Sequence, residues 1–379
     1  MRVLFFNEGN LGTHILGQAQ LETALRVGLS EQADVEARFA GLSSMGTLTG
    51  LLATRPLPPL AKAQLDFRAL RWHMVQSLRA RARLRAQLRT WPADVVHVHT
   101  QSVALALGAT MRSLPVVLSV DTTVRDWCSM PAWAHSDFSM ASTITPSRAL
   151  ERRALCGAAL VLAWSGWARR AVQREAPGAN VVELHPGIDL NRYLPSLRRE
   201  RPRPRVLFVG GRFKQKGGED LLAALGDRLG RDMDVELVTP AEVPAQAGVR
   251  VHRLESSDPR LLDLFQQADV LALPTYGDAA PWVVLEAMAC GTPVVASPVG
   301  AIPDMLDEGR AGVLVPYGDP RALGEALGAL LDDGARRARL AEAARAHCER
   351  NYDARRQFAR LAGHLRELTR VVPAAAPAL

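Results

Sequence analysis

Two acidic side chains flank the start of a predicted helix in GDAAPWVVLEAMACGTPVVAS, residues 277–297. Asp278 precedes a proline, which is favoured in the first turn of a helix, and Glu286 lies just over one turn inside it. The backbone N–H groups of Trp282 and Val283 would then attract an anion at the helix N-terminus. A carboxylate accepts two hydrogen bonds well, so Glu286 suits the vicinal hydroxyls of a ribose and Asp278 suits a sugar hydroxyl. Asp278 could instead cap the helix.

Two cations lie on one loop in FVGGRFKQKGGEDLL, residues 208–222, between a predicted strand and a predicted helix. Arg212 can bind oxygens in a bidentate manner and Lys216 acts as a point charge, so together they suit a diphosphate. The alternative is an ordinary solvated loop. If the loop binds a diphosphate, the phosphate groups lie next to the carboxyl end of this strand.

Further candidates follow strands nearer the N-terminus. In NEGNLGTH, residues 7–14, Gly9 and Gly12 let backbone N–H groups approach an anion, although an ordinary turn fits the pattern equally well. The stretch is not GxGxxG, so NAD binding is not predicted. In SVDTTVRDW, residues 119–127, Asp121 lies at the end of a strand. It could contact a substrate hydroxyl, act as a base, or take part in a cap or turn.

The sequence predicts neither a metal site nor a resident cofactor. Asp232 and Asp234 have a spacing that can hold a divalent ion, but they come before a strand and so belong to the wrong edge of a parallel sheet. The four cysteines are scattered, without a CxxC pair or a histidine cluster at ligand spacing. We expect all four to be buried, small apolar side chains.

Short runs rich in Val, Ile and Leu alternate with helical patterns, which is typical of parallel sheets buried on both faces. One set runs from RVLFF at 2–6 to NVVELHPG at 180–187, and a second runs from RVLFVGG at 205–211 to GVLVP at 312–316. The predicted fold class is therefore α/β, with two doubly wound, Rossmann-like domains facing a cleft. In such sheets ligands lie at the carboxyl ends of the strands, where the candidate residues are found.

The predicted domains comprise residues 1–195 and 196–351, in line with about 150 residues per domain. A C-terminal helix over about 352–370 is expected to pack back on the first domain, and residues 371–379 are expected to form a disordered tail. The N-terminus turns polar too early for a signal peptide, and no apolar run has the length of a membrane span. We therefore expect a cytoplasmic protein.

The segment from Arg68 to Arg89 contains seven arginines and no acidic residue, so its charge alone equals the formal net charge of the chain, +7. This local excess argues against a general nucleic-acid binder. On a helical projection Trp72 lies among arginines beside an apolar stripe, which suits an anionic membrane surface. Residues 67–89 thus predict peripheral contact with the inner face of a membrane. Because three arginines intrude on the apolar side, a solvated, partly broken helix is the alternative.

Taken together, these residues resemble the family 4 glycosyltransferases of group 1 type, retaining enzymes with the two-Rossmann GT-B fold. The resemblance covers nearly the whole chain and is strongest from Arg205 to Pro316. Its most specific part is ADVLALPTYGDAAPWVVLEAMACGTPVVASPVGAIPDMLDEGRAGVLVP, which looks like the family signature with two glutamates separated by seven residues.

The resemblance implies a metal-independent hexosyltransferase that uses a UDP-, GDP- or ADP-sugar as co-substrate. The acceptor would be a hydroxyl of a glycan, a lipid-linked glycan or a small molecule, as in polysaccharide biosynthesis. By position, Glu286 would hold the donor ribose and Asp278 the transferred sugar. Arg212 and Lys216 would bind the donor diphosphate, and Gly12 would meet a donor phosphate.

Three positions depart from the family pattern. Asp278 is one methylene shorter than the usual glutamate, and Pro281 replaces a glycine found in many members. Asp121 stands where a histidine is common near the donor sugar. The departures at Asp121 and Asp278 leave open a non-catalytic nucleotide-sugar binding protein on the same fold. The resemblance also leaves open a GT-B nucleotide-sugar epimerase or a phosphorylase.

Overall fold

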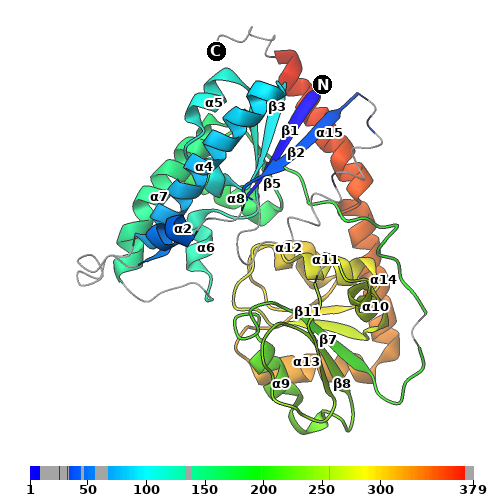
Figure 1. Cartoon of the computed structure of the whole chain (residues 1–379). Helices are drawn as coiled ribbons and strands as arrows, with labels where there is room; N and C mark the ends of the chain where they lie inside the picture. The colour runs from blue at the N-terminus through cyan, green and yellow to red at the C-terminus, as the bar shows by residue number, and fades with distance from the viewer. Residues whose placement is uncertain are drawn as a thin grey trace. The chain divides into compact units, whose positions relative to one another are not determined.

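The structure of the 379-residue chain is a computed structural model. It describes residues 1–8, 25, 32, 34–43, 47–55, 67–132, 138–197, 199–255 and 257–371. Gly12 and, apart from Val371, the tail predicted over 371–379 lie outside the described residues. The chain divides into two compact units, each with its own parallel sheet (Figure 1). Unit 1 comprises Met1–Ser129, Trp133–His185 and Arg355–Leu379, and unit 2 comprises Met130–Ala132 and Pro186–Ala354.

Unit 1 contains a six-stranded sheet in the order β2-β1-β3-β4-β5-β6, with every neighbouring pair parallel. Strands β3, β4 and β5 are buried along their whole length, which explains why they lack an alternating polar pattern. Strand β2 is absent from the predicted set because this partly exposed edge strand contains no continuous apolar run. The strands are β1 (Arg2–Asn7), β2 (Glu36–Gly41), β3 (Val95–His99), β4 (Val116–Val120), β5 (Leu160–Ala163) and β6 (Val181–Glu183).

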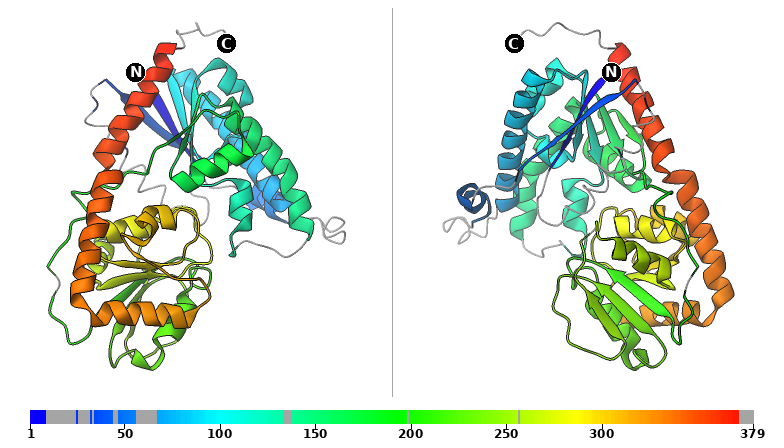
Figure 2. Two further views of the ribbon diagram at one scale, coloured as in Figure 1. Left: turned by 180° about the vertical axis from the view of Figure 1, so that it is seen from behind. Right: turned by 45° about the vertical axis from the view of Figure 1, so that its right-hand side comes forward.

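Helices cover this sheet, and two of the longest, α4 and α7, lie side by side (Figure 2). Helix α8 begins at a side-chain cap, since the Ser165 side chain accepts a hydrogen bond from the Ala168 N–H. The last helix, α15, joins unit 1 through Arg366, which pairs with Asp34 at 2.7 Å from Nε. The helices are α2 (Thr47–Thr54), α4 (Arg68–Thr90), α5 (Gly108–Ser113), α6 (Val124–Ser129), α7 (Phe138–Gly157), α8 (Gly166–Glu175) and α15 (Ala354–Val371).

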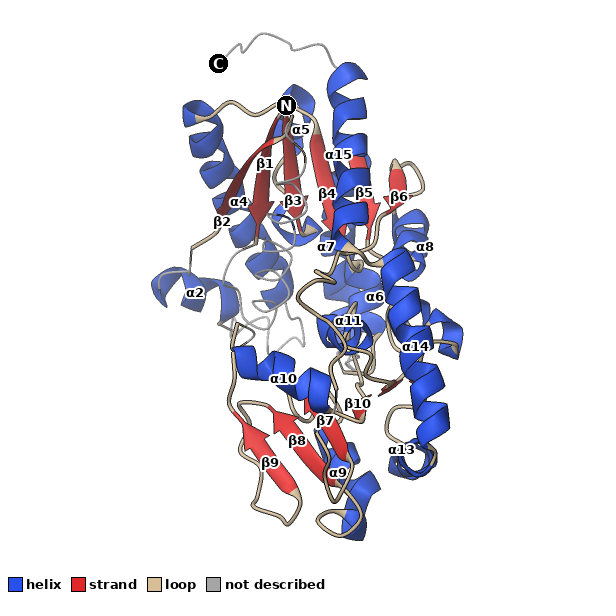
Figure 3. Cartoon of the chain, turned by 90° about the vertical axis from the view of Figure 1, so that its right-hand side faces the viewer, coloured by secondary structure: helices blue, strands red, loops and turns tan. Residues whose placement is uncertain are grey.

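Unit 2 contains a second six-stranded parallel sheet, in the order β12-β11-β10-β7-β8-β9. Strands β7, β8 and β9 of this sheet lie side by side in Figure 3. The chain runs from β7 to β8 and β9 on one side, and returns to the other side of β7 for β10, β11 and β12. The two sheets confirm the predicted doubly wound α/β fold class. The strands are β7 (Arg205–Val209), β8 (Asp234–Val238), β9 (Val249–His252), β10 (Val270–Leu273), β11 (Val294–Ala296) and β12 (Val313–Leu314).

Two apolar cores sandwich this second sheet. On one face Leu207 and Leu271 pack in a core with residues of α10, α11 and α14, and on the other face Val206 and Phe208 pack with residues of α9 and α13. The strands are thus buried on both sides, as their unbroken apolar sequences require. The helices are α9 (Gly218–Leu225), α10 (Pro259–Gln267), α11 (Trp282–Ala289), α12 (Ile302–Met305), α13 (Pro320–Asp332) and α14 (Gly334–Asn351).

The segment 186–195, predicted as the end of the first domain, is bound to unit 2. The Ile188 N–H donates to the Tyr352 carbonyl at 2.7 Å, and the Ala354 N–H donates to the Ile188 carbonyl at 3.0 Å. Beyond it, three arginines pair with acids of the same unit. These pairs are Arg199–Asp263 at 2.9 Å, Arg201–Asp269 at 3.3 Å and Arg203–Asp234 at 3.1 Å.

Candidate functional site

The loop carrying the predicted cations and the loop carrying Asp278 meet at one edge of the unit 2 sheet. Strands β7 and β10 are neighbours from which the chain winds in opposite directions, so their carboxyl ends mark the topological switch point. The Tyr276 N–H donates to the Gln215 carbonyl at 3.0 Å, which joins the loops directly. Gly217 has a φ of +77°, and a Cβ there would lie 2.1 Å from the Pro274 carbonyl oxygen. Glycine permits this close approach of the two loops.

Lys216 and Asp278 form an ion pair between Nζ and Oδ2. The Lys216 Nζ also donates to the Gly277 carbonyl at 3.4 Å. The two side chains are only 22% and 19% exposed, so their attraction is less screened than that of a surface pair. The N-cap of α11 is Pro281 and makes no side-chain cap hydrogen bond, so Asp278 is a partner of Lys216 and not a helix cap.

Arg212 lies on the same turn as Lys216. The Lys216 N–H donates to the Arg212 carbonyl at 2.9 Å, and the Arg212 Nη1 donates to the Gln215 Oε1 at 3.3 Å. Burial lowers the pKa of the Arg212 guanidinium from its usual value, but an arginine remains charged at neutral pH. The two predicted cations therefore lie together at the switch point.

Helix α11 begins at Trp282, so Trp282 and Val283 are its first two residues, and both are half-buried. Glu286 lies further along this helix and is only 2% exposed. The Tyr193 hydroxyl donates to the Glu286 Oε1 at 2.9 Å. Burial and then the negative charge of Glu286 raise the pKa of Tyr193 above its usual range, so this hydroxyl keeps its proton. Glu286 is thus a buried carboxylate with a fixed donor.

In unit 1, Asp121 directly follows β4 and precedes α6, at the carboxyl edge of the sheet, and it is half-buried. At the switch point of this sheet, between β1 and β3, the Glu8 N–H donates to the His99 carbonyl at 2.9 Å. The Ser102 hydroxyl donates to the Glu8 Oε2 at 3.0 Å. Gly12, further along the sequence, lies outside the described residues.

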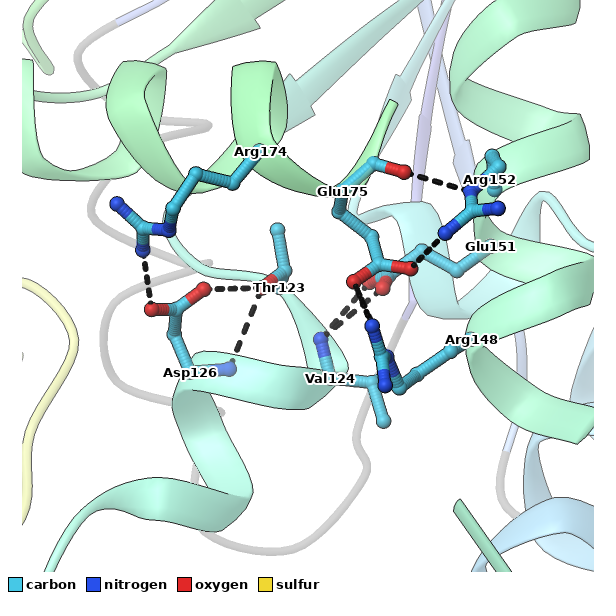
Figure 4. A network of polar contacts seen from close by, with 8 residues as sticks. All are labelled: Thr123, Val124, Asp126, Arg148, Glu151, Arg152, Arg174 and Glu175. Carbon is cyan, nitrogen blue, oxygen red and sulfur yellow. Dashed lines mark hydrogen bonds and ion pairs between the residues drawn. The ribbon is translucent and has the colours of Figure 1, made fainter. Parts of the chain in front are cut away.

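A polar network connects α6, α7 and α8 (Figure 4). Both carboxylate oxygens of Glu151 accept from the Val124 N–H, at 3.0 and 3.2 Å, and the Gln101 Nε2 donates to Glu151 at 3.2 Å. Burial raises the pKa of Glu151 to about 8, although these hydrogen bonds oppose the shift. Arg174 pairs with Asp126 at 2.6 Å. The network fixes the start of the short helix that follows Asp121.

The structure brings five predicted residues to one edge of unit 2: Arg212, Lys216, Asp278 and, at the start of α11, Trp282 and Val283. Asp121 belongs to unit 1. Tyr193 and Glu151 were not among the predicted site residues, because nothing in the local sequence marks either side chain as buried.

Asp232 and Asp234, whose spacing could hold a divalent ion, both form ion pairs with arginines. Asp232 pairs with Arg228 at 3.3 Å and with Arg231 at 3.0 Å, and Asp234 pairs with Arg203. Within the described part of the chain, no group of three or more His, Cys, Asp and Glu side chains is placed to hold a metal ion. No helix in that same part has the length and apolar character needed to cross a bilayer.

Two family models match the chain. The model described as Glycosyltransferase Family 4 matches residues 49–192, and the model described as Glycosyl transferases group 1 matches residues 203–333. Among curated relatives, the D-inositol 3-phosphate glycosyltransferase of Corynebacterium diphtheriae is 38% identical over 194 residues, which are 45% of this chain and 45% of that protein. The chain spans about half the length of the curated relatives it matches.

Solved structures match nearly the whole chain. Sucrose-phosphate synthase from Thermosynechococcus elongatus has a TM-score of 0.71 at 18% identity, with 98% of this chain and 100% of that chain covered. The Anabaena protein HepE, in complex with UDP-glucose, has a TM-score of 0.63 at 17% identity, with 97% and 100% covered. At this level of identity the likeness concerns the fold.

Proposed function

The chain belongs to the glycosyltransferases of family 4 and group 1 and has their GT-B fold, and from this we propose that it is a retaining hexosyltransferase. Its donor would be a nucleoside diphosphate sugar and its acceptor a hydroxyl group. The HepE structure contains UDP-glucose, and a nucleotide sugar is the co-substrate that we propose for this chain as well.

The observation that carries this proposal is the convergence of Arg212, Lys216 and Asp278 at the β7/β10 switch point, beside the start of α11. Two cations and a helix N-terminus suit a diphosphate, and the carboxylate suits a sugar hydroxyl. In open α/β sheets, ligands bind at this kind of edge.

In the proposed reaction, the bond from the sugar C1 to the diphosphate oxygen breaks while a bond from C1 to the acceptor oxygen forms on the same face. The leaving phosphate oxygen takes the acceptor proton. Arg212 and Lys216 stabilise the charge that develops on the diphosphate, with the helix N-terminus at Trp282 and Val283. Asp278 positions the sugar and Glu286 the ribose. Asp121 is proposed to contact the sugar or the acceptor from the N-terminal domain, and Gly12 to meet a donor phosphate.

The test begins with thermal-shift screening of UDP-, GDP- and ADP-sugars, because a bound donor raises the melting temperature. The donor that binds is then incubated with the protein alone and with a panel of hydroxyl acceptors. Transfer to an acceptor, with slow release of free nucleotide in its absence, supports a transferase. An epimerised sugar would indicate an epimerase, phosphate-dependent cleavage a phosphorylase, and tight binding without turnover a non-catalytic binding protein.

The residue assignment is tested with Lys216→Ala. Loss of one contact to developing charge typically lowers the rate about 100- to 1000-fold. Lys214→Ala is the matched control, because this neighbouring lysine is 83% exposed and pairs only loosely with Glu219, at 3.6 Å. Near-normal turnover of Lys216→Ala, with the fold intact, would overturn the assignment.

A further inference from the structure

The Tyr193–Glu286 hydrogen bond links two segments that lie far apart in the sequence. Tyr193 belongs to the segment that enters unit 2, and Glu286 belongs to α11, 93 positions later. Both residues are buried, at 7% and 2% exposure, so solvent does not compete for the bond. A buried carboxylate is costly unless it is hydrogen-bonded, and a hydroxyl donor aimed at its oxygen offsets part of that cost.

The backbone of Tyr193 is held by Arg345 of α14, which also binds the end of the helix that carries Glu286. Arg345 Nη1 donates to the Tyr193 carbonyl at 2.7 Å and to the Ala289 carbonyl, at the end of α11, at 2.5 Å. The Arg345 Nε pairs with Glu349 at 2.6 Å, which fixes the guanidinium. Ile188, earlier in the same segment, is joined to Tyr352 and Ala354 by backbone hydrogen bonds. The hydroxyl is therefore presented to Glu286 from a rigid frame.

We propose that Tyr193 is a positioning residue that holds Glu286 in the orientation in which it accepts hydrogen bonds from the ribose of a nucleoside diphosphate. The inference deepens the proposed function and rests on it. The Tyr193 hydroxyl donates to Oε1 at 2.9 Å, which limits rotation of the Glu286 carboxylate about its last bond. A carboxylate held in one orientation presents its acceptor oxygens to a diol in a fixed direction. Tyr193 thus supports recognition of ribose without touching it.

The consequence is a preference for ribose over 2′-deoxyribose that depends on the tyrosine hydroxyl. A hydrogen bond to a charged group contributes roughly a tenfold or larger change in affinity. We expect the wild type to bind the ribonucleoside diphosphate at least about tenfold more tightly than its 2′-deoxy counterpart. Tyr193→Phe keeps the ring and its packing but removes the donor, so the preference should fall to about two- or threefold.

The experiment measures affinities by calorimetry. UDP, GDP and ADP are first tested on the wild type, and the one that binds is compared with dUDP, dGDP or dADP of the same base. Tyr352→Phe is the matched control, because Tyr352 is a buried tyrosine of the same apolar cluster whose backbone bonds survive the change. It should keep the ribose preference. Melting temperatures are measured for all proteins, since a merely structural role would lower stability without changing the affinity ratio.

Arg345→Lys provides a second variant that alters neither side chain of the pair. It removes the guanidinium that holds the Tyr193 and Ala289 carbonyls, so the ribose preference should again fall. An unchanged ratio in Tyr193→Phe would overturn the inference while leaving the transferase proposal intact. If Tyr193→Phe does not fold, an unchanged ratio in Arg345→Lys overturns it instead. If the wild type binds none of the three diphosphates, the proposed function and the inference both fail.

Discussion

Lys216 and Asp278, which are predicted to bind the diphosphate and the transferred sugar of a donor, are joined to each other by an ion pair. The pair is largely shielded from solvent and lies where the loops after β7 and β10 meet. Asp278 is also the position where a glutamate is usual in the family. A lysine has three donors, so Lys216 can hold Asp278 and a phosphate oxygen at the same time. The pair would then orient the sugar clamp before the donor arrives.

The first prediction concerns the energy of this pair in the absence of ligand. Lys216→Ala and Asp278→Asn should each destabilise the protein, because each leaves a partly buried charge without its partner. The double variant should be more stable than the sum of the two effects implies, with a coupling of about 0.5–3 kcal/mol. Urea unfolding of the four proteins measures it. If the effects of the two single changes add up in the double variant, the ion pair makes no net contribution to the free energy of unfolding.

A second prediction concerns Glu151 and pH. A carboxyl whose pKa is about 8 in the folded chain and 4.5 in the unfolded chain binds its proton more strongly when folded. Its contribution to stability is therefore greatest below pH 4.5 and declines as pH rises toward 8. Glu151→Gln should remove this decline. The measurement is the free energy of unfolding at pH 5 and pH 8 for both proteins, compared as a difference between the two pH values.

His97 acts in the opposite direction and serves as an internal reference. Burial lowers its pKa to about 4, so its contribution favours the folded state above pH 6.5 and is lost as pH falls toward 4. This contribution is the same in the wild type and in Glu151→Gln, and it cancels in the comparison. Equal pH dependence in the two proteins would show that Glu151 is ionised throughout.

The sequence predicted the parts of the site that depend on local pattern. Strand ends place Arg212, Lys216 and Asp278, and the rule that parallel strands share a carboxyl edge brings them together. Local pattern does not reveal Tyr193, because its partner lies on a helix far along the chain and a tyrosine in a loop has no periodic signal. The burial of Glu286 was missed for the same reason, since a helical carboxylate is usually solvated.

A third prediction concerns the thiols, for which the expectation of four buried side chains was wrong. Cys156 is exposed on α7 and Cys128 is half-buried, whereas Cys290 and Cys348 are buried. Burial raises the pKa of Cys290 and of Cys348 to about 12, so neither forms much thiolate near neutral pH. Alkylation of the native protein, followed by mass spectrometry, should modify Cys156 first and Cys128 slowly. Rapid modification of Cys290 or Cys348 would contradict this arrangement.

The last prediction is that the basic helix α4 binds anionic membrane. Its buried residues include Gln76, Ser77, Ala80 and Leu84, while Leu78 is 50% exposed. Two of its arginines are engaged inside unit 1, because Arg71 donates to the Arg55 carbonyl and Arg79 donates to the Ser43 carbonyl.

Arg83, Arg85 and Arg89 are exposed on α4, and we expect these arginines to contact lipid. Each basic residue near an anionic surface contributes about 1 kcal/mol, so changing all three to Glu should reduce recovery with phosphatidylglycerol vesicles more than tenfold. Liposome flotation measures this recovery. The control changes Arg336, Arg339 and Arg350, exposed residues of α14, to Glu, which alters the net charge equally. If the two triple variants float equally, the attraction depends on total charge and α4 is not a membrane-binding helix.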